Sequence, residues 1–463
     1  QARFANAEAV VFLGRALALL PDTAVTERYE LLLAREAIYN LLGQRDAQTA
    51  DLDSLEKLAE TLGDARRAEV LQRQAQYAEH MGDFVRARAQ LEQSLTIAQT
   101  LNNQAMAADA LYYLGVIASR QASYAEALEK LEHSLALVRT VTDPLVESKI
   151  LRAMGVVAWY LGHYTESAAY YQQSLALARA IGHRRFESYC LGNLGLVASN
   201  IGDPDQARVY HEQSLAISRA IGDRAAQGRT LNNLGETACT VGEYAQGQAY
   251  LAESLRLARL VGNRPSENLA LLNLARVALA LAEYDTARTS FAQVLATAQA
   301  IGDRRQQGSA RQGLGSTALE EGRLQDATGH FQEALQLWQE LGLLRSLDAR
   351  IGLARVALAQ GEHKDALAWV EPALAALATQ GEGDAFDPMR IHLTCYQVLQ
   401  VNGDSRAPDI LRQAHTLLQE QAARIPDEAT RQSFLEKVLV HREILQAFAA
   451  LSQEEADHTD FYR

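Results

Sequence analysis

The sequence repeats itself with a period of 40 residues, and this repeat limits the possible folds more than any other feature. A short motif, in which an apolar residue precedes a glycine, recurs in the same phase at Gly115, Gly155, Gly195, Gly235 and Gly315, with Ala275 at the missing place. One repeat of this length cannot bury an apolar core alone, so neighbouring repeats must stack on one another. The chain is therefore expected to form a solenoid rather than a set of separate globular domains.

Each repeat is predicted to contain two helices. In the repeat over residues 184–223, apolar residues recur at helical spacing. Gly202 and Gly222 are expected to end the two helices in the left-handed conformation that favours glycine. Asp203 and Asp223 are expected to cap the helices that follow them. No stretch of useful length shows the alternation that is typical of a strand, so the fold class is expected to be all-α.

The repeat pattern divides the chain into an array with one appended helix. About ten helix pairs are expected over residues 24–424, in a right-handed superhelical solenoid of antiparallel pairs. Residues 1–23 match only the second helix of a preceding repeat, so the chain is expected to begin within the array. Residues 425–451 are predicted to form one amphipathic helix that caps the last pair, and residues 452–463 a polar tail.

The composition argues against several classes of function. The formal net charge of −13 does not suit a surface for nucleic acid, which must be basic. No stretch approaches the roughly 18 apolar residues of a membrane span. The three cysteines, Cys190, Cys239 and Cys395, form no metal-binding or disulfide pattern, so no metal or cofactor and a reduced, cytoplasmic setting are expected.

Catalytic residues are not expected in this chain, because no nucleophile stands in a recognisable pattern with a base. The histidines at helix ends or on outer faces are expected to be exposed to solvent; these are His80, His133, His163, His183, His211 and His363. Paired acidic residues such as Glu320 and Glu321 are expected to be solvated. The Gly-Asp junctions are interpreted as helix caps and not as phosphate-binding loops.

The motif resembles the tetratricopeptide repeat. The residues that carry the resemblance in one repeat are Leu191, Leu194, Gly195, Ala198, Ala207 and Ser214. The longer period is similar to that of kinesin-light-chain arrays and of the sensor regions of bacterial STAND signal-transduction ATPases, such as the maltose-regulon activator. In those regulators a nucleotide-binding module precedes the array. No Walker motif occurs in this chain, so the resemblance implies that any ATPase activity would lie in an upstream module.

Three asparagines stand two residues before the repeat glycine position in consecutive repeats, namely Asn193, Asn233 and Asn273. The resemblance implies that the first helix of each pair lines a concave groove, where amides at this place hold a peptide backbone. An amide both donates and accepts hydrogen bonds, so such a ladder also suits sugar hydroxyls. The alternative is that these amides bond neighbouring helices or face water.

Further groove residues are predicted from the same helices, and the set is Tyr112, Tyr113, Arg152, Trp159, Tyr189, Arg229, Asn232, Glu236 and Arg276. Aromatic rings together with amides and arginines suit a sugar, a nucleoside or a peptide. The alternative is that the aromatic residues at helical spacing fill the core.

Two functions follow from these predictions. The first is a ligand-sensing domain of a bacterial multidomain regulator, in which an inducer, either a small molecule or a peptide, binds in the groove and shifts the state of the missing ATPase module. The second is a scaffold that docks a peptide segment of a partner protein. Neither function involves nucleic acid or a membrane through this region.

Overall fold

The computed structural model describes residues 2–121, 123–341, 346–380 and 387–461. Within these residues the chain is all-α, with 23 helices and no strand, and it divides into two compact units, Gln1–Gly182 and His183–Arg463. The helices of unit 1 are α1 (Ala2–Leu19), α2 (Val25–Leu42), α3 (Arg45–Leu62), α4 (Asp64–His80), α5 (Phe84–Thr100), α6 (Gln104–Arg120), α7 (Tyr124–Val141), α8 (Pro144–Tyr160) and α9 (Tyr164–Ala180).

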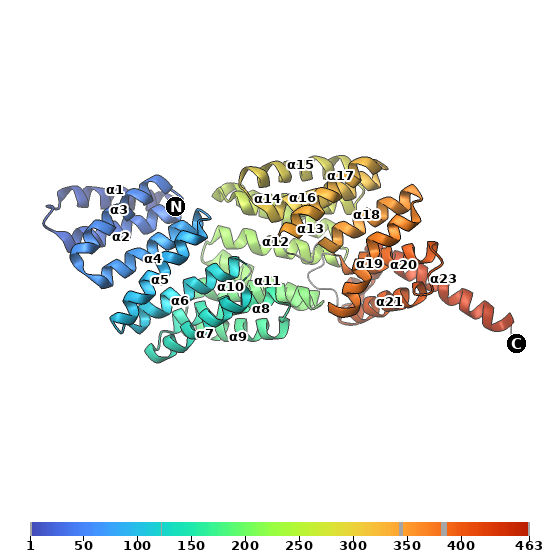
Figure 1. Cartoon of the computed structure of the whole chain (residues 1–463), viewed down its shortest axis with the longest axis horizontal. Coiled ribbons are helices and arrows are strands. Elements are labelled where there is room, and N and C mark those ends of the chain that lie inside the picture. The colour runs from blue at the N-terminus through green and yellow to red at the C-terminus, as the bar shows by residue number, and fades with distance from the viewer. Residues whose placement is uncertain (1, 122, 342–345, 381–386, 462–463) are drawn as a thin grey trace. The chain divides into compact units, whose positions relative to one another are not determined.

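Unit 2 contains the remaining helices, and in both units consecutive helices pack on one another as pairs (Figure 1). They are α10 (Arg184–Asn200), α11 (Pro204–Ala220), α12 (Arg224–Thr240), α13 (Tyr244–Val261), α14 (Arg264–Ala280), α15 (Tyr284–Ala300), α16 (Arg304–Glu320), α17 (Leu324–Glu340), α18 (Ser346–Gln360), α19 (His363–Gln380), α20 (Pro388–Val401), α21 (Ala407–Ala423), α22 (Glu428–Lys437) and α23 (Leu439–Phe461). The predicted all-α array of stacked helix pairs is confirmed. The repeat pattern, which is continuous across Gly182, gives no sign of the division into two units.

The predicted helix ends are confirmed at the junctions between helices. Gly202 and Gly222 adopt positive φ values of 77° and 69°, which place them in the left-handed region. The side chain of Asp203 accepts a hydrogen bond from the backbone N–H of Gln206, and it caps α11. Asp223 caps α12 in the same way. At these two junctions the chain therefore reverses through one glycine and one capping residue.

The repeat glycines lie where the two helices of a pair cross closely. A Cβ at Gly235 would stand 2.6 Å from the Leu251 Cγ and 3.1 Å from the Gly247 carbonyl oxygen. The facing side chain comes 16 residues after the glycine position in every repeat of this series, and the set is Leu131, Tyr171, His211, Leu251, Phe291 and Phe331. The glycine therefore leaves the space that a large side chain of the second helix fills, and this offsets its low helix propensity.

A serine hydrogen bond also joins the two helices within successive repeats. The hydroxyl of Ser134 donates to the backbone carbonyl of Ala108 at 2.7 Å. Equivalent bonds from the second helix to a carbonyl 26 residues earlier are made by Ser94, Ser174, Ser214 and Ser254. In the next repeat the direction is reversed, because the Asn268 side chain donates to the Val294 carbonyl. These serines are buried, so each bond satisfies a polar group inside the packed pair.

His211 corrects the expectation that the histidines near helix ends and on outer faces are exposed. It is fully buried in α11, against Gly195 of α10, where other repeats have leucine, tyrosine or phenylalanine. Among the described residues neither ring nitrogen has a hydrogen-bond partner. Burial lowers the pKa of His211 to about 4, so the ring is neutral at physiological pH. His80, His133, His163 and His363 are exposed as expected, and His183 is half-buried.

The C-terminal segment differs from the predicted single helix over 425–451. The structure has two helices there, α22 and α23, and the break lies at Val438, whose backbone is extended. Helix α23 also continues to Phe461, through most of the predicted polar tail. The cause is the packing of α22 and α23 on α20 and α21, which requires a change of direction that one straight helix could not make.

Candidate functional site

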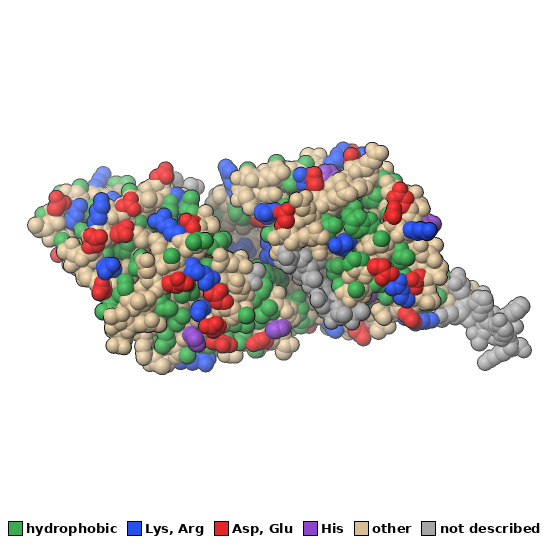
Figure 2. Space-filling view, viewed as in Figure 1, with side chains coloured by type: hydrophobic (Ala, Val, Ile, Leu, Met, Phe, Trp, Pro, Cys, Tyr) green, Lys and Arg blue, Asp and Glu red, His purple; other side chains and the backbone are tan. Residues whose placement is uncertain are grey.

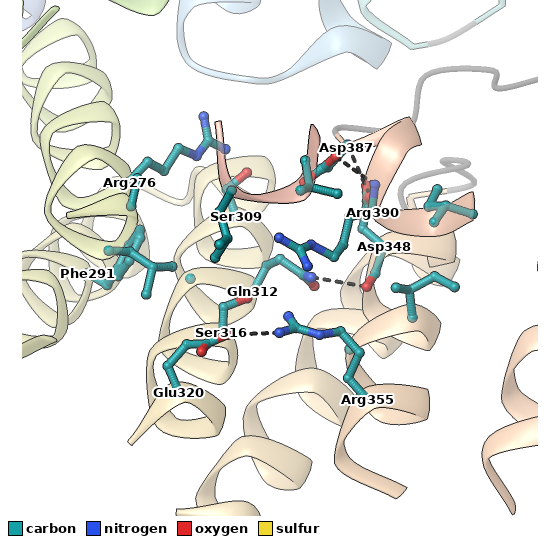
Figure 3. Close-up of a pocket in the computed structure, with 18 of the residues that line it drawn as sticks. Arg276, Phe291, Ser309, Gln312, Ser316, Glu320, Asp348, Arg355, Asp387 and Arg390 are labelled. Carbon is teal, nitrogen blue, oxygen red and sulfur yellow. Dashed lines mark hydrogen bonds and ion pairs between the residues drawn. The ribbon is translucent and has the colours of Figure 1, made fainter. Parts of the chain in front are cut away.

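Unit 2 contains a cavity of about 360 Å³ that is lined by the first helices of several repeats. Helices α14, α16, α18 and α20 contribute its walls, and the junction between α22 and α23 contributes the residues at 438–440 (Figure 3). A volume in this range is typical of pockets for small molecules, which hold roughly 300–1,000 Å³.

Helix α16 presents one polar face to this cavity, because its lining residues recur at intervals of three and four. These are Ser309, Gln312, Ser316 and Glu320. Helix α18 contributes Asp348 and Arg355 from the facing wall, and Arg276 of α14 stands at one end (Figure 3). The cavity therefore combines hydroxyl, amide, carboxylate and guanidinium groups.

Hydrogen bonds and ion pairs hold these polar side chains in place. The Arg355 guanidinium donates to a Glu320 carboxylate oxygen at 2.8 Å, which joins α18 to α16. The Gln312 amide donates to the Asp348 carbonyl at 3.1 Å. Arg390 of α20 pairs with Glu443 of α23 at 2.7 Å. The donors and acceptors are therefore preorganised, and a ligand would not have to order flexible side chains.

The cavity also has an apolar lining. Phe291 is fully buried and lies directly against Gly313, where a Cβ would not fit. Trp338 is 2% exposed, and Ile351 and Ile391 are equally buried in the walls. An apolar lining with a few fixed polar groups suits a ligand that has both an apolar body and hydrogen-bonding substituents.

The structure brings three of the predicted groove residues together beside this cavity. Arg276 lines the cavity, and its guanidinium donates to the Asn273 side-chain oxygen at 2.9 Å. The Asn273 amide in turn donates to the Asn232 side-chain oxygen at 3.2 Å, across two neighbouring repeats. Both asparagines are 4% exposed. At these two positions the amides bond neighbouring helices, and their effect on a ligand would pass through Arg276.

The other two members of the asparagine ladder have a different environment. Asn193 of α10 and Asn233 of α12 are half-buried, and neither side chain forms a hydrogen bond with another residue of the described segments. Glu236, one turn further along α12, is also half-buried. The three asparagines of the ladder therefore do not form one equivalent row.

Tyr189 and Arg229 form a second group of predicted residues at the N-terminal halves of α10 and α12. The Arg229 guanidinium lies over the Tyr189 ring at 5.2 Å from its centroid, and Arg185 lies 5.9 Å from the same centroid. Arg185 also pairs with Asp223 at 2.8 Å. Two guanidinium groups therefore lie within cation–π distance of the same aromatic ring.

The remaining predicted residues, Tyr112, Tyr113, Arg152 and Trp159, lie in unit 1. The rings of Tyr112 and Tyr113 meet edge to face at 5.0 Å, and Trp159 meets Tyr160 in the same way at 5.1 Å. Burial raises the pKa of Tyr112, and the neighbouring Arg152 opposes this rise. Burial also raises the pKa of Tyr113 to about 12, so both phenols stay protonated.

Several cavity residues were not predicted from the sequence, and only one of them has a recognisable signal there. Arg355 follows Ala354 as Arg276 follows Ala275, but the interval between them is 79 residues instead of twice 40, because one repeat is a residue shorter. Allowing for this deletion places both arginines at the same repeat position. Arg390 lies in the divergent repeat, where the motif does not fix the register.

Two other observations concern function. Within the described residues no group of three or more His, Cys, Asp or Glu side chains is placed to hold a metal ion. None of the described helices is both long and apolar enough to cross a membrane. On the face shown in Figure 2, acidic and basic side chains are interspersed.

Comparisons with known proteins show the family. The sequence model of the MalT-like TPR region matches residues 193–459, and that of the tetratricopeptide repeat matches residues 106–180 and 146–220. No curated protein matches the sequence.

Three solved structures are similar to this chain at low sequence identity. The Rap conjugation gene regulator of the plasmid pLS20, in complex with the Phr* peptide, has a TM-score of 0.52 at 14% identity, over 73% of this chain and 96% of that one. The apo quorum sensor NprR from B. thuringiensis has a TM-score of 0.50 at 12% identity, over 73% and 97%. A STAND protein with a tetratricopeptide repeat sensor from Pyrococcus horikoshii has a TM-score of 0.49 at 13% identity, over 82% and 57%. Because the model of the MalT-like TPR region matches more than half of this chain, the chain belongs to the MalT-like TPR family.

Proposed function

We propose that this chain is the ligand-sensing domain of a larger bacterial regulator, and that a small polar inducer binds in the cavity of unit 2. The observation that carries the proposal is the cavity itself, which combines preorganised Arg355, Glu320 and Gln312 with an apolar lining. Its volume of about 360 Å³ favours a small molecule over a long peptide. Membership of a family of sensor-type repeat arrays supports this role.

Binding of the inducer would reach the rest of a regulator through the repeats. The cavity is built by helices of four successive pairs, so a ligand contacts several repeats at once. In a repeat array each pair touches only its neighbours, and small changes in each pair's packing add along the stack. We propose that a module outside this chain, such as an ATPase, responds to that change.

A thermal-shift screen with maltose, sucrose, ATP, AMP, citrate and trialanine tests the proposal. A ligand at 100 times its Kd stabilises the folded state by about 2.7 kcal/mol, which raises the Tm of a unit of this size by roughly 5–11 °C. We expect Arg355→Gln to abolish the shift, because it removes the guanidinium between α18 and α16.

The matched control is Arg256→Gln, which removes an arginine of an exposed ion pair with Glu253 on α13. This variant should keep the full thermal shift. If Arg355→Gln retains the shift of the wild-type chain, the ligand does not bind in this cavity and the proposal is wrong.

The second candidate function is a scaffold that docks a peptide of a partner protein. It is favoured by Asn193 and Asn233, whose half-buried amides stand one repeat apart and form no hydrogen bond within the described segments. One similar solved structure is a regulator in complex with a peptide. Binding of a peptide that is lost in Asn193→Ala and Asn233→Ala, but kept in Arg355→Gln, would favour this second function.

A further inference from the structure

The turn between α12 and α13 is buried by residues that follow it by about 150 to 200 positions in the sequence. Val241, at the tip of this turn, is 1% exposed and belongs to one apolar cluster with Met389, Leu393, Phe434 and Val440. A valine at a turn tip is ordinarily exposed. Val241 is buried because α20, which carries Met389 and Leu393, and the C-terminal helices, which carry Phe434 and Val440, cover it. We call helices α21, α22 and α23 the cap.

The contact between turn and cap is close at the level of the backbone. Gly242 has a φ of 78°, and a Cβ there would stand 2.9 Å from the Lys437 Cβ and 3.0 Å from the Ser433 carbonyl oxygen. Gly222, at the preceding turn, has a φ of 69° and nothing within 4 Å. The space that is open at Gly222 is therefore filled by the cap at Gly242.

A second contact joins the cap to the turn between α10 and α11. The Arg424 guanidinium, at the end of α21, donates a hydrogen bond to the Ile201 carbonyl. The same guanidinium lies 3.3 Å from the position of a Cβ at Gly202. The cap therefore touches the tips of two successive repeat turns, at Ile201 and at Val241.

The cap also forms one wall of the cavity. Val438, Leu439 and Val440, at the break between α22 and α23, line the cavity opposite the repeat helices. Val440 contributes to the cluster that buries Val241 and to the cavity wall at the same time. A movement of the cap away from the turn would therefore remove this wall.

We propose that the cap is a clamp that opens and closes on the turns at Ile201 and Val241, and that its opening unseals the cavity of unit 2. The contacts to the turns consist of one apolar residue, one backbone approach and one arginine hydrogen bond, whereas the cap's own core contains Leu411, Leu418 and Ile444 among others. The contacts between the cap and the turns are the weaker set, so they separate before the core of the cap does. That a ligand in the cavity would hold the clamp closed rests on the proposed function. The opening of the clamp does not depend on that function.

Thiol labelling of the full chain tests the clamp without a ligand. A Val241→Cys variant, in a Cys239→Ser background, places a thiol under the cap, and N-ethylmaleimide reacts with it only when the cap opens. The native Cys190 and Cys395 are both 0% exposed and serve as references for global unfolding. We expect Cys at position 241 to react at least tenfold faster than Cys190 and Cys395, as measured by mass spectrometry of the labelled peptides. Equal rates at all three thiols would overturn the proposal.

A substitution on the cap, distant from the reporter, separates cap opening from fraying of the turn. Arg424→Ala removes the hydrogen bond to Ile201 and should raise the labelling rate at position 241 about fivefold, since such a bond contributes about 1 kcal/mol. Arg412→Ala removes an exposed ion pair with Asp409 on the same helix and should leave the rate unchanged. If Arg424→Ala has no larger effect than Arg412→Ala, the turn frays by itself and the clamp is refuted.

A second pair of variants tests the turn side. Gly242→Ala and Gly222→Ala carry the same left-handed backbone strain, but only the first also collides with the cap. We expect Gly242→Ala alone to accelerate labelling at position 241. Loss of the thermal shift in the ligand screen, with fast labelling retained, would reject the proposed function and leave the clamp standing.

Discussion

The buried imidazole of His211 predicts how the stability of unit 2 depends on pH. Burial lowers the pKa of His211 to about 4, whereas an unfolded histidine has a pKa near 6.5. Between these values the unfolded chain binds a proton that the folded chain does not, so the free energy of unfolding falls as the pH falls. Above pH 6.5 the imidazole is neutral in both states, so it does not change the free energy of unfolding. The decrease in this free energy is complete below pH 4.

The expected loss between pH 7 and pH 5 is about 2 kcal/mol from this one side chain. Urea denaturation followed by circular dichroism at the two pH values measures it. His211→Leu is the matched variant, because leucine fills the equivalent position in other repeats, at Leu131 and Leu251. All other titrating groups are shared, so the pH dependence of the variant should be smaller than that of the wild-type chain by about 2 kcal/mol.

The assignment of this pH dependence to His211 fails if the wild-type chain and His211→Leu lose the same free energy of unfolding between pH 7 and pH 5. It also fails if the ring carbon signals of His211, followed by NMR, titrate near pH 6.5. Either result would show that water or a polar group reaches the imidazole in the folded protein.

Three further outcomes follow from the packing. Gly235→Ala should lower the free energy of unfolding by about 1–3 kcal/mol through overpacking. Gly329 is exposed in the middle of α17 with open space around it, so Gly329→Ala should raise the free energy of unfolding by about 0.5–1 kcal/mol. Urea denaturation curves that shift in the same direction for both variants would contradict the packing argument. Asn273→Ala should lower the free energy of unfolding by about 1–2 kcal/mol in a thermal melt, because it removes two side-chain hydrogen bonds. Asn233→Ala should lower it by less than about 0.5 kcal/mol. Equal losses in the two variants would contradict the assigned bonds. Ser254→Ala should cost about 0.5–1.5 kcal/mol in the same melt, because it removes the hydrogen bond that joins α13 to the Gly228 carbonyl of α12. An unchanged Tm would show that this bond does not stabilise the pair.

Within the regular repeats, the local signals in the sequence were sufficient to predict where helices begin and end. Gly202 with Asp203, and Gly222 with Asp223, act through their own backbone and side-chain chemistry, which does not depend on distant residues. The repeat glycines likewise predicted the close crossing of helices, because the period itself places the same contact in each pair. These are features that a single repeat contains completely.

The features that could not be predicted from the sequence depend on contacts beyond one repeat. His211 is polar, and only the register against Gly195 shows that it occupies a core position. Asn232 and Asn273 bond to each other across two repeats, whereas Asn233 does not, although the period alone gives no reason to distinguish them. Arg390 and the cavity wall at Val438 come from the divergent C-terminal region, which the repeat cannot place.

The serine bonds that join the two helices of each repeat have a consequence for how such a domain can diversify. Ser134, Ser174, Ser214 and Ser254 all donate to a main-chain carbonyl, and a main-chain acceptor is present whatever side chain the first helix carries. The side chains that the first helix presents away from its partner helix are therefore not needed for this bond. Selection can alter them one by one toward a new ligand, while the architecture that presents them is inherited unchanged.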